Sequence, residues 1–350
     1  MSRSPVLNLS CPLPLRDHPR VLMAHGGGGR MSAQLIEKVF RAAFEPDAGQ
    51  KILHDGIVLD LPQQKIAMTT DSFVVRPLFF PGGDIGTLAV NGTVNDLAMC
   101  GARPKFLAAS FILEEGLEIE TLWNIVCSMR EAADRSGVSI VTGDTKVVER
   151  GHGDGVYINT TGVGVLEHDR VISPEQVKPG DAVLLSGDVG RHGMAVMAQR
   201  EDLGFSSSIR SDCAPLSSSV LALLEDGLSV HCLRDATRGG LAAVLNEIAG
   251  SSGCPIECEE NSIPVDVSVR GACELLGLDP LHVANEGCYV AFVDAKDAQR
   301  ALAIMKRHHE RAALIGAVGK GTAGQVTLRT AVGGIRILDM PSGTLLPRIC

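Results

Sequence analysis

The amino-acid sequence predicts an α+β fold in two domains. Both halves of the 350-residue chain contain apolar runs typical of strands and apolar stripes at helical spacing, without a regular βα alternation. Polar clusters of Gly and Asp follow several predicted strands. A polar connection at residues 175–181, with Pro174, Pro179 and Gly180, separates the two halves. We therefore expect an N-terminal arm over residues 1–20, an N-terminal domain over 21–170, a C-terminal α/β domain over 180–335 and a mobile tail over 336–350.

The first half is predicted to contain three helices and four strands. Apolar residues recur at helical spacing over residues 31–40, directly after a run of glycines. Asp84 is the expected N-cap of a second helix, which stops at Gly101. The clearest helix covers residues 120–136, where an apolar stripe ends at Gly137. The predicted strands of this half are residues 65–70, 106–113, 138–141 and 156–166.

The second half repeats this mixture of strands and helices. Its predicted strands are residues 182–185, 231–233, 289–293 and 312–318. Its predicted helices begin after Gly193 and cover residues 216–224, 241–249 and 298–308.

The composition argues against several classes of protein. The net charge is −9 and aromatic residues make up 3% of the chain, which argues against a nucleic-acid groove and against base-stacking surfaces. The ten cysteines include no CxxC pair and no Cys/His set with zinc-finger spacing. Pro5, Pro12 and Pro14 interrupt the short apolar run near the N-terminus, so we predict neither a signal peptide nor a membrane span. We expect a cytoplasmic chain with reduced thiols.

Four consecutive glycines, Gly26, Gly27, Gly28 and Gly29, precede the first predicted helix. Backbone N–H groups of such a run can converge on one anion, and the start of a helix adds a favourable dipole. The run is neither a GxGxxG motif nor a Walker loop, which requires Lys-Ser/Thr after its last glycine. A phosphate-binding loop and a flexible turn without a ligand both remain open.

Three aspartates lie in polar clusters. Asp71 and Asp144 each follow a predicted strand, and Asp96 belongs to a Gly-Thr-Val-Asn-Asp run. A hard divalent cation on a nucleotide needs a few carboxylate oxygens and otherwise keeps phosphate and water as ligands. Aspartates at such positions also serve as caps, so a metal site and a purely local role are both possible on these residues alone.

Lys146 and Glu286 are two further candidates. Lys146 lies two residues after Asp144, so an extended chain would place both side chains on one face. Glu286 stands in an Asn-Glu-Gly turn. A surface lysine and a solvated glutamate are the alternatives to a catalytic cation and a general base.

The sequence ends on Pro-Arg-Ile-Cys, with a thiol at Cys350. Pro341, Gly343 and Pro347 resist both helix and interior strand, so we expect an extended tail of about 10 residues that reaches on the order of 30 Å. A carrier thiol on a moving end and a terminus without function are the two interpretations.

Several strings occur together in a fixed order, namely Thr-Thr-Asp at 69–71, Asn-Asp at 95–96, Thr-Gly-Asp at 142–144 and Asp-Ala-Thr-Arg-Gly-Gly at 235–240. They resemble the superfamily of aminoimidazole ribonucleotide synthetase, which includes selenophosphate synthetase and thiamine-phosphate kinase. Within it, the chain is similar to the HypE family of hydrogenase maturation factors in His-Gly-Gly-Gly-Gly at 25–29, Phe-Phe-Pro-Gly-Gly at 79–83, Thr-Gly-Asp-Thr-Lys-Val-Val at 142–148, Asn-Glu-Gly at 285–287 and the Cys350 tail. The resemblance covers about residues 21–350.

The resemblance implies a two-domain PurM-like fold. The N-terminal domains would pair their strands into a barrel across a homodimer, with ATP and Mg²⁺ in a cleft. The implied ATP contacts are Gly26, Gly27, Gly28, Gly29, Asp71, Asn95, Asp96, Asp144 and Thr145. The implied metal ligands are Asp71, Asp96 and Asp144.

The resemblance also implies a reaction on the chain's own thiol. A carbamoyltransferase, HypF, would load a carbamoyl group onto Cys350. ATP-dependent dehydration of this S-carboxamide would leave a thiocyanate, whose cyano group passes to iron on a HypC–HypD complex for the [NiFe]-hydrogenase centre. Glu286 would act as the base, and Lys146 would stabilise charge on the carbamoyl oxygen or assist proton removal.

Two other functions are compatible with these motifs. One is another PurM-like enzyme that phosphorylates an oxygen of a free small molecule, which would not need Cys350. The other is an ATP-gated carrier or scaffold for maturation partners, which would keep the tail but perform no chemistry with Glu286 and Lys146.

Overall fold

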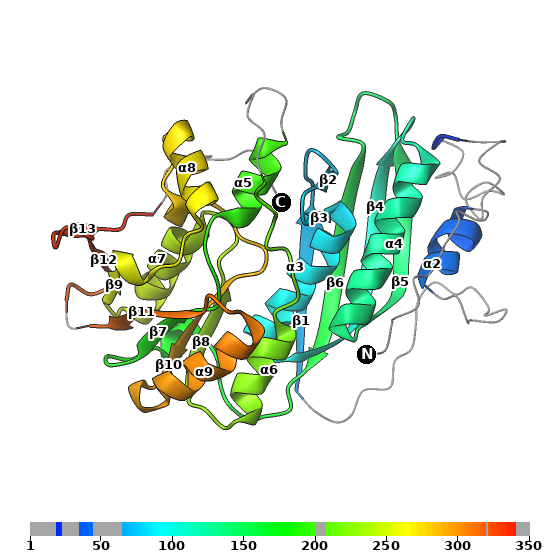
Figure 1. Ribbon diagram of the computed structural model, residues 1–350. Helices are drawn as coiled ribbons and strands as arrows, with labels where there is room; N and C mark the ends of the chain where they lie inside the picture. Colours follow the sequence, from blue (N-terminus) through cyan, green and yellow to red (C-terminus); the bar gives the residue numbers. More distant parts are fainter. Residues whose placement is uncertain (1–18, 23–34, 45–64, 200–207, 320, 341–350) are drawn as a thin grey trace, which may run out of the picture.

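The computed structural model describes residues 19–22, 35–44, 65–199, 208–319 and 321–340. Two sheets stand side by side, the N-terminal sheet on the right of Figure 1 and the C-terminal sheet on the left. A six-residue π-helix, η2 (Ile36–Arg41), and the short α-helix α2 (Ala42–Phe44) pack next to the N-terminal sheet and α4.

The N-terminal sheet has four strands in the order β1-β6-β4-β5. They are β1 (Ile66–Phe73), β4 (Arg103–Glu114), β5 (Ser139–Val148) and β6 (Val156–Val165). The pairs β1–β6 and β4–β6 are antiparallel, and β4–β5 is parallel. Among the described residues, β1 and β5 are therefore the two edges of an open sheet.

Two helices cover one face of this sheet, α3 (Ile85–Met99) and α4 (Ile119–Ser136). A small hairpin, β2 (Phe79–Phe80) and β3 (Gly83–Asp84), leads into α3. The Asp84 side chain caps α3 by accepting hydrogen bonds from the N–H groups of Gly86 and Thr87, as predicted. The predicted apolar stripe of α4 is buried, and Gly137 ends that helix with a φ of 66°.

The C-terminal sheet has seven strands in the order β13-β12-β9-β11-β7-β10-β8. They are β7 (Ala182–Leu185), β8 (Val230–Asp235), β9 (Ile256–Glu259), β10 (Tyr289–Val293), β11 (Ala313–Val318), β12 (Val326–Arg329) and β13 (Ile335–Ile337). Helices cover both faces of this sheet, and alternate residues of β7 therefore belong to different hydrophobic cores. Val183 and Leu185 pack with α7, whereas Ala182 and Leu184 pack with α6 and α9.

The helices of this domain are α5 (Arg191–Ala198), α6 (Ser217–Glu225), α7 (Gly240–Ser252), α8 (Val267–Leu276) and α9 (Ala298–His308). Short 3₁₀ turns connect them, namely η3 (Pro174–Gln176), η5 (Glu260–Ser262), η6 (Pro280–His282) and η7 (Ala295–Asp297).

Helix α3 joins the two domains. Of its 15 residues all except Asp96 are buried, because α3 packs on the N-terminal sheet, on α4 and also on α6 and β8. Ala98 and Met99 belong to the core formed by α6 and α9. Polar side chains on α3 are therefore held between the domains.

Two strand ends differ from the sequence prediction. The strand predicted at residues 65–70 continues to Phe73, and the strand predicted at 138–141 continues to Val148. In both cases ladder pairing continues past the polar cluster, so Asp71 and Asp144 lie inside strands and the prediction that they follow strands is wrong. α8, β9, β12 and β13 were not predicted.

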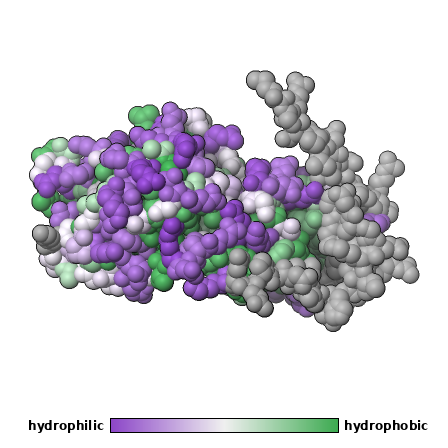
Figure 2. All heavy atoms as spheres, turned by 90° about the horizontal axis from the view of Figure 1, so that it is seen from below, coloured by the Kyte–Doolittle hydropathy of each residue, from purple (hydrophilic) through white to green (hydrophobic). Residues whose placement is uncertain are grey.

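No helix within the described ranges combines the length and apolar composition needed to cross a membrane. Figure 2 shows a face on which hydrophilic residues predominate, with hydrophobic residues in patches between them.

Candidate functional site

A cleft of about 550 Å³ lies where the two domains meet. The N-terminal domain lines it with residues of β1 and α3, and the C-terminal domain with residues of β8, α7 and the intervening loop. Its carboxylates are Asp71, Asp96, Asp235, Glu247 and Glu286, and its cations are Arg234 and Arg238. Two predicted metal ligands and the predicted base therefore meet in one cavity.

Asp71 and Asp96 form a close pair of carboxyl groups. Asp71 lies on β1, on the face covered by α3, and Asp96 lies in the last turn of α3. Thr69 donates a hydrogen bond of 2.8 Å from its Oγ1 to Oδ2 of Asp96. Burial, and then the charge of Asp96 and a hydrogen bond with it, raise the pKa of Asp71 to about 6. The pair thus holds negative charge that a bound cation would stabilise.

The C-terminal domain contributes the buried carboxyl groups of Glu286 and Asp235 to the same cleft. Glu286 is 4% exposed and Asp235 is 8% exposed. Burial, followed by the charges of Asp235, Asp212 and Asp71, raises the pKa of Glu286 well above its ordinary value. Burial and the charge of Asp96 raise the pKa of Asp235 to about 7. A buried carboxylate with a raised pKa is a stronger base than a solvated one.

The cleft fits a divalent cation only if the ligand brings oxygens of its own. Among the described residues no group of three or more His, Cys, Asp and Glu side chains is arranged to hold a metal by itself. Mg²⁺ bound to a nucleotide needs one or two carboxylates together with phosphate oxygens and water. The Asp71–Asp96 pair meets that requirement.

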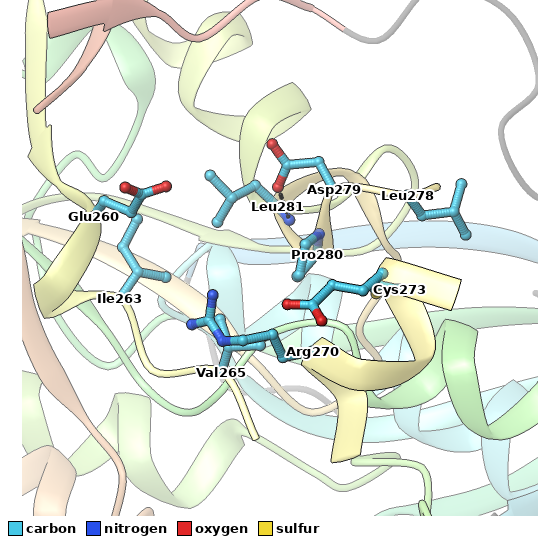
Figure 3. Close-up of a pocket in the computed structure, with 10 residues that line it drawn as sticks. Glu260, Ile263, Val265, Arg270, Cys273, Leu278, Asp279, Pro280 and Leu281 are labelled. Carbon is cyan, nitrogen blue, oxygen red and sulfur yellow. Dashed lines mark hydrogen bonds between the residues drawn. The ribbon is translucent and has the colours of Figure 1, made fainter. Parts of the chain in front are cut away.

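A second pocket, of about 260 Å³, lies in the C-terminal domain between α8, η5 and η6. Figure 3 shows Glu260, Arg270 and Asp279 around it. Asp279 accepts a hydrogen bond from Leu281 N and pairs with Arg336, and Glu260 accepts one from Ala331 N. Because these carboxylates already serve local structure, the cleft between the domains is the better candidate.

Comparison with known proteins identifies the two domains that meet at this cleft. The profile of the AIR synthase related protein N-terminal domain matches residues 53–166, and that of the AIR synthase related protein C-terminal domain matches residues 178–329. Carbamoyl dehydratase HypE of Cupriavidus necator is 50% identical, and the match covers 100% of both chains.

The chain belongs to the HypE family of carbamoyl dehydratases.

Solved structures of HypE proteins have the same fold as this chain. A crystal structure of the hydrogenase maturation protein HypE in complex with ATP is 48% identical and superposes with a TM-score of 0.89, covering 94% of this chain and 99% of that chain. A crystal structure of a HypE–HypF complex is 50% identical with a TM-score of 0.77, covering 88% of this chain and 99% of that chain.

Asn95 of this HypE-family chain is 1% exposed and is not among the residues that line the cleft. Its Oδ1 accepts a hydrogen bond of 2.8 Å from Leu216 N, and its Nδ2 donates to the carbonyl oxygens of Ala214 and Glu286 at 3.1 and 3.4 Å. The amide therefore connects α3 to the C-terminal domain. Its predicted contact with ATP remains a prediction.

Asp144 and Lys146 lie away from the cleft of their own chain. Both are exposed on β5, and their side chains share a face, as the spacing predicted. Asp71 on β1 pairs through Thr160 and Ala109 with Gly143, so three strand spacings, about 14 Å, separate the edges. Asp144, one residue further along, points to the opposite face of the sheet. Thr145 points to the helix-covered face and is half-buried.

The glycine run Gly26–Gly29 and the tail with Cys350 lie outside the described residues. Their predicted roles in binding ATP and in carrying the carbamoyl group remain predictions.

Neither Asp235 nor Asp212 was predicted from the sequence to belong to the site. Asp235 had a local signal, since it ends strand β8 just before Ala-Thr-Arg-Gly-Gly. Asp212 had none, because the backbone groups it binds belong to Glu286 and Gly287, more than 70 residues later.

Proposed function

We propose that this chain is an ATP-dependent carbamoyl dehydratase that converts an S-carboxamide on its own Cys350 into a thiocyanate. The observation that carries the proposal is the buried Glu286, whose pKa is raised by burial and which lines the same cleft as the Asp71–Asp96 pair. The family relationship supports the same activity. The thiocyanate would supply the cyanide ligand of the [NiFe]-hydrogenase iron.

The reaction divides into activation and elimination. ATP, with Mg²⁺ on its phosphates, supplies the phosphoryl group that turns the carbamoyl oxygen into a leaving group. The oxygen then leaves as inorganic phosphate, and the nitrogen loses two protons as the C≡N bond forms. The balance is S-carboxamide plus ATP giving thiocyanate, ADP, phosphate and one released proton.

The described residues suit these two tasks. Asp71 and Asp96 would hold the metal on the phosphates, with Asp144 as the further ligand. Glu286 would take a proton from the carbamoyl nitrogen, because burial raises its pKa and makes it a better proton acceptor than a solvated carboxylate. The neutral carbamoyl group enters a buried cleft at little desolvation cost. Lys146 would offset charge on the oxygen.

The distance between the two sheet edges leads us to propose a homodimer. Asp144 and Lys146 cannot reach the cleft of their own chain from the far edge and the opposite face. That face also leaves Ile66, Met68 and Ile112 exposed by 52%, 70% and 44%. A second copy that pairs its sheet with this one into a barrel would cover these apolar side chains and place the partner's β5 next to β1.

We further propose that the carbamoyltransferase HypF loads Cys350 and that a HypC–HypD complex receives the cyano group. A solved HypE–HypF complex with a chain 50% identical to this one supports the first of these.

Intact-mass spectrometry of the full chain tests the proposed function. After incubation with carbamoyltransferase, we expect a gain of one carbamoyl group in place of a hydrogen. After ATP is added, we expect the loss of one water. Cys350→Ala should prevent loading but keep ATP binding, and Glu286→Gln should load and then stall, because the amide cannot accept the proton.

Other results would favour the alternatives. ATP turnover on a free small molecule by Cys350→Ala would indicate a different PurM-like enzyme. Retention of the carbamoyl group by the wild-type chain in ATP would indicate a carrier or scaffold. Normal thiocyanate formation by Glu286→Gln would exclude Glu286 as the base.

A further inference from the structure

The segment from Ile209 to Leu216 passes between the two domains and contacts the turn that carries Glu286. Ser211 N donates to Pro81 O at 2.7 Å, and Leu216 N donates to Oδ1 of Asn95. The Ser211 hydroxyl interacts with Nδ1 of the buried His192 at 2.9 Å and accepts from Cys213 N. The segment is therefore tied to both domains on either side of Asp212.

Asp212 holds the backbone at Glu286. The N–H of Glu286 donates to both carboxylate oxygens of Asp212 at 3.2 Å, and the N–H of Gly287 donates to Oδ2 at 2.9 Å. On the other side of the same residue, Ala214 N and Asn95 Nδ2 donate to Glu286 O. Both peptide groups that flank the Glu286 side chain are thus fixed.

The close approach of the two segments depends on Gly287. A Cβ atom at residue 287 would collide with the carbonyl oxygen of Asp212, so only glycine permits this contact. The Asn-Glu-Gly turn and the segment at Asp212 therefore pack in direct backbone contact.

We propose that Asp212 is a positioning residue for Glu286, which fixes the turn through its two N–H groups and places a negative charge behind the base. This inference rests on the proposed function, because it assigns Asp212 a part in the same dehydration. Asp212 does not line the cleft, so it would act only through Glu286.

The negative charge of Asp212 affects the pKa of Glu286. Burial has the largest influence on the pKa of Glu286, followed by the charges of Asp235, Asp212 and Asp71 and by the opposing charge of Arg238. The negative charge of Asp212 raises the pKa of Glu286, whereas Arg238 lowers it. Removing the Asp212 charge should therefore lower the pKa of Glu286. Because a base acts only when deprotonated, the rising limb of the pH–rate profile should move to lower pH.

Asp212→Asn tests the charge separately from the geometry. An amide oxygen at the Oδ2 position can still accept from both Glu286 N and Gly287 N. The variant therefore loses the charge and the contact of Glu286 N with Oδ1, while each N–H group keeps an acceptor. The measurement is the single-turnover rate of thiocyanate formation by the carbamoylated full chain with ATP, followed by intact mass between about pH 5 and pH 9. We expect the rising limb to move down by at least about half a pH unit, with loading and ATP binding unchanged.

Two further variants separate positioning from folding. Asp212→Ala leaves both N–H groups without an acceptor, and we expect the rate to fall roughly 10- to 100-fold at every pH. Asp297→Asn is the matched control, because Asp297 is also buried and accepts from a backbone N–H, that of Ser229, but its partners lie outside the cleft. The control should keep the wild-type profile.

A measurement on the wild-type chain keeps the inference testable if the variants fail to fold. Burial raises the pKa of Asp212 to about 6, so its charge is present above that pH and lost below it. Since a carboxylate accepts hydrogen bonds more strongly than a carboxylic acid, hydrogen-exchange protection of the Glu286 and Gly287 amides should fall as the pH drops through about 6.

The outcomes distinguish this inference from the proposed function. A wild-type chain that never forms thiocyanate overturns the proposed function. If wild type converts and Glu286→Gln stalls, but Asp212→Asn superimposes on wild type and Asp212→Ala keeps its rate, Asp212 has no positioning role. Amide protection that does not change with pH would also overturn it.

Discussion

At the scale of single residues, the cleft brings together carboxyl groups whose negative charges repel one another. Asp71, Asp235 and Glu286 all have pKa values raised by burial and by neighbouring negative charge. A raised pKa means that the folded chain binds protons more tightly than the unfolded chain. The associated stabilisation is complete below the unfolded pKa and is lost as the pH rises through the folded pKa. The cleft therefore costs stability at neutral pH.

Asp235→Asn should increase stability while it lowers activity. The variant removes a buried charge whose pKa is raised to about 7, so at pH values above 7 we expect the free energy of unfolding to rise by on the order of 2 kcal/mol. The gain should shrink as the pH falls from 7 toward the unfolded pKa of 3.8, because below that value the carboxyl group of the wild type is protonated in both states. Urea unfolding at several pH values measures the effect. A gain that does not depend on pH would contradict this explanation.

Some residues of the cleft could be predicted from local patterns in the sequence. Asp71 and Asp96 belong to polar strings beside apolar runs, and both line the cleft. Glu286 was assigned through a family resemblance, and its burial was unexpected for a glutamate in a turn. The role of Asp212 depends on contacts between distant segments, which no local pattern encodes.

At the scale of elements, helices with a clear apolar stripe were predicted well. α4 begins within one residue of its expected start, because its stripe and its terminal glycine are both local signals. β9, β12 and β13 have four, four and three residues, too short for a periodic pattern. β9 and β12 pair in parallel, and that pairing joins distant segments. Their formation depends on the assembled sheet.

The close packing of α3 and α4 gives a prediction at this scale. A Cβ atom on Gly86 would collide with the backbone carbonyl of Ile125 and approach Oγ of Ser128 to 2.5 Å. Gly86→Ala should therefore force the helices apart and lower the free energy of unfolding by about 1–3 kcal/mol.

Gly271→Ala is the matched control for this substitution. Gly271 lies inside α8, and a Cβ atom there meets nothing within 4 Å. Because alanine favours the helix, the control should raise stability by about 0.5–1 kcal/mol. Thermal unfolding of both variants gives the comparison, and equal effects would argue against helix contact as the cause.

At the scale of the whole molecule, the described part of one chain does not bring Asp144 and Lys146 to its own cleft. If the proposed homodimer forms through the uncovered sheet face, a charge on that face should prevent it. We expect Ile112→Glu to yield monomers that no longer convert the carbamoyl group. Val332→Glu should change neither property, although Val332 is 94% exposed and equally apolar, because it lies in the turn between β12 and β13. Light scattering gives the mass of the particle. A dimeric Ile112→Glu chain would count against the proposed interface.

Mixed dimers test whether Lys146 serves the partner's cleft. Lys146→Ala and Glu286→Gln should each be inactive alone. If one site uses Glu286 of one chain and Lys146 of the other, random mixing restores about a quarter of the wild-type sites. If each chain uses its own Lys146, mixing restores none.

The segment around Asp212 also affects how the molecule unfolds. It contributes backbone bonds to Pro81 in the N-terminal domain, to Asn95 on α3 and to Glu286 in the C-terminal domain. Neither domain can lose its fold without leaving the polar groups of the other unpaired, and unpaired buried groups are costly. The two sheets should therefore melt as a single cooperative unit. A chain cut at the apparent boundary near residue 175 would produce two fragments that each lack part of their own interior.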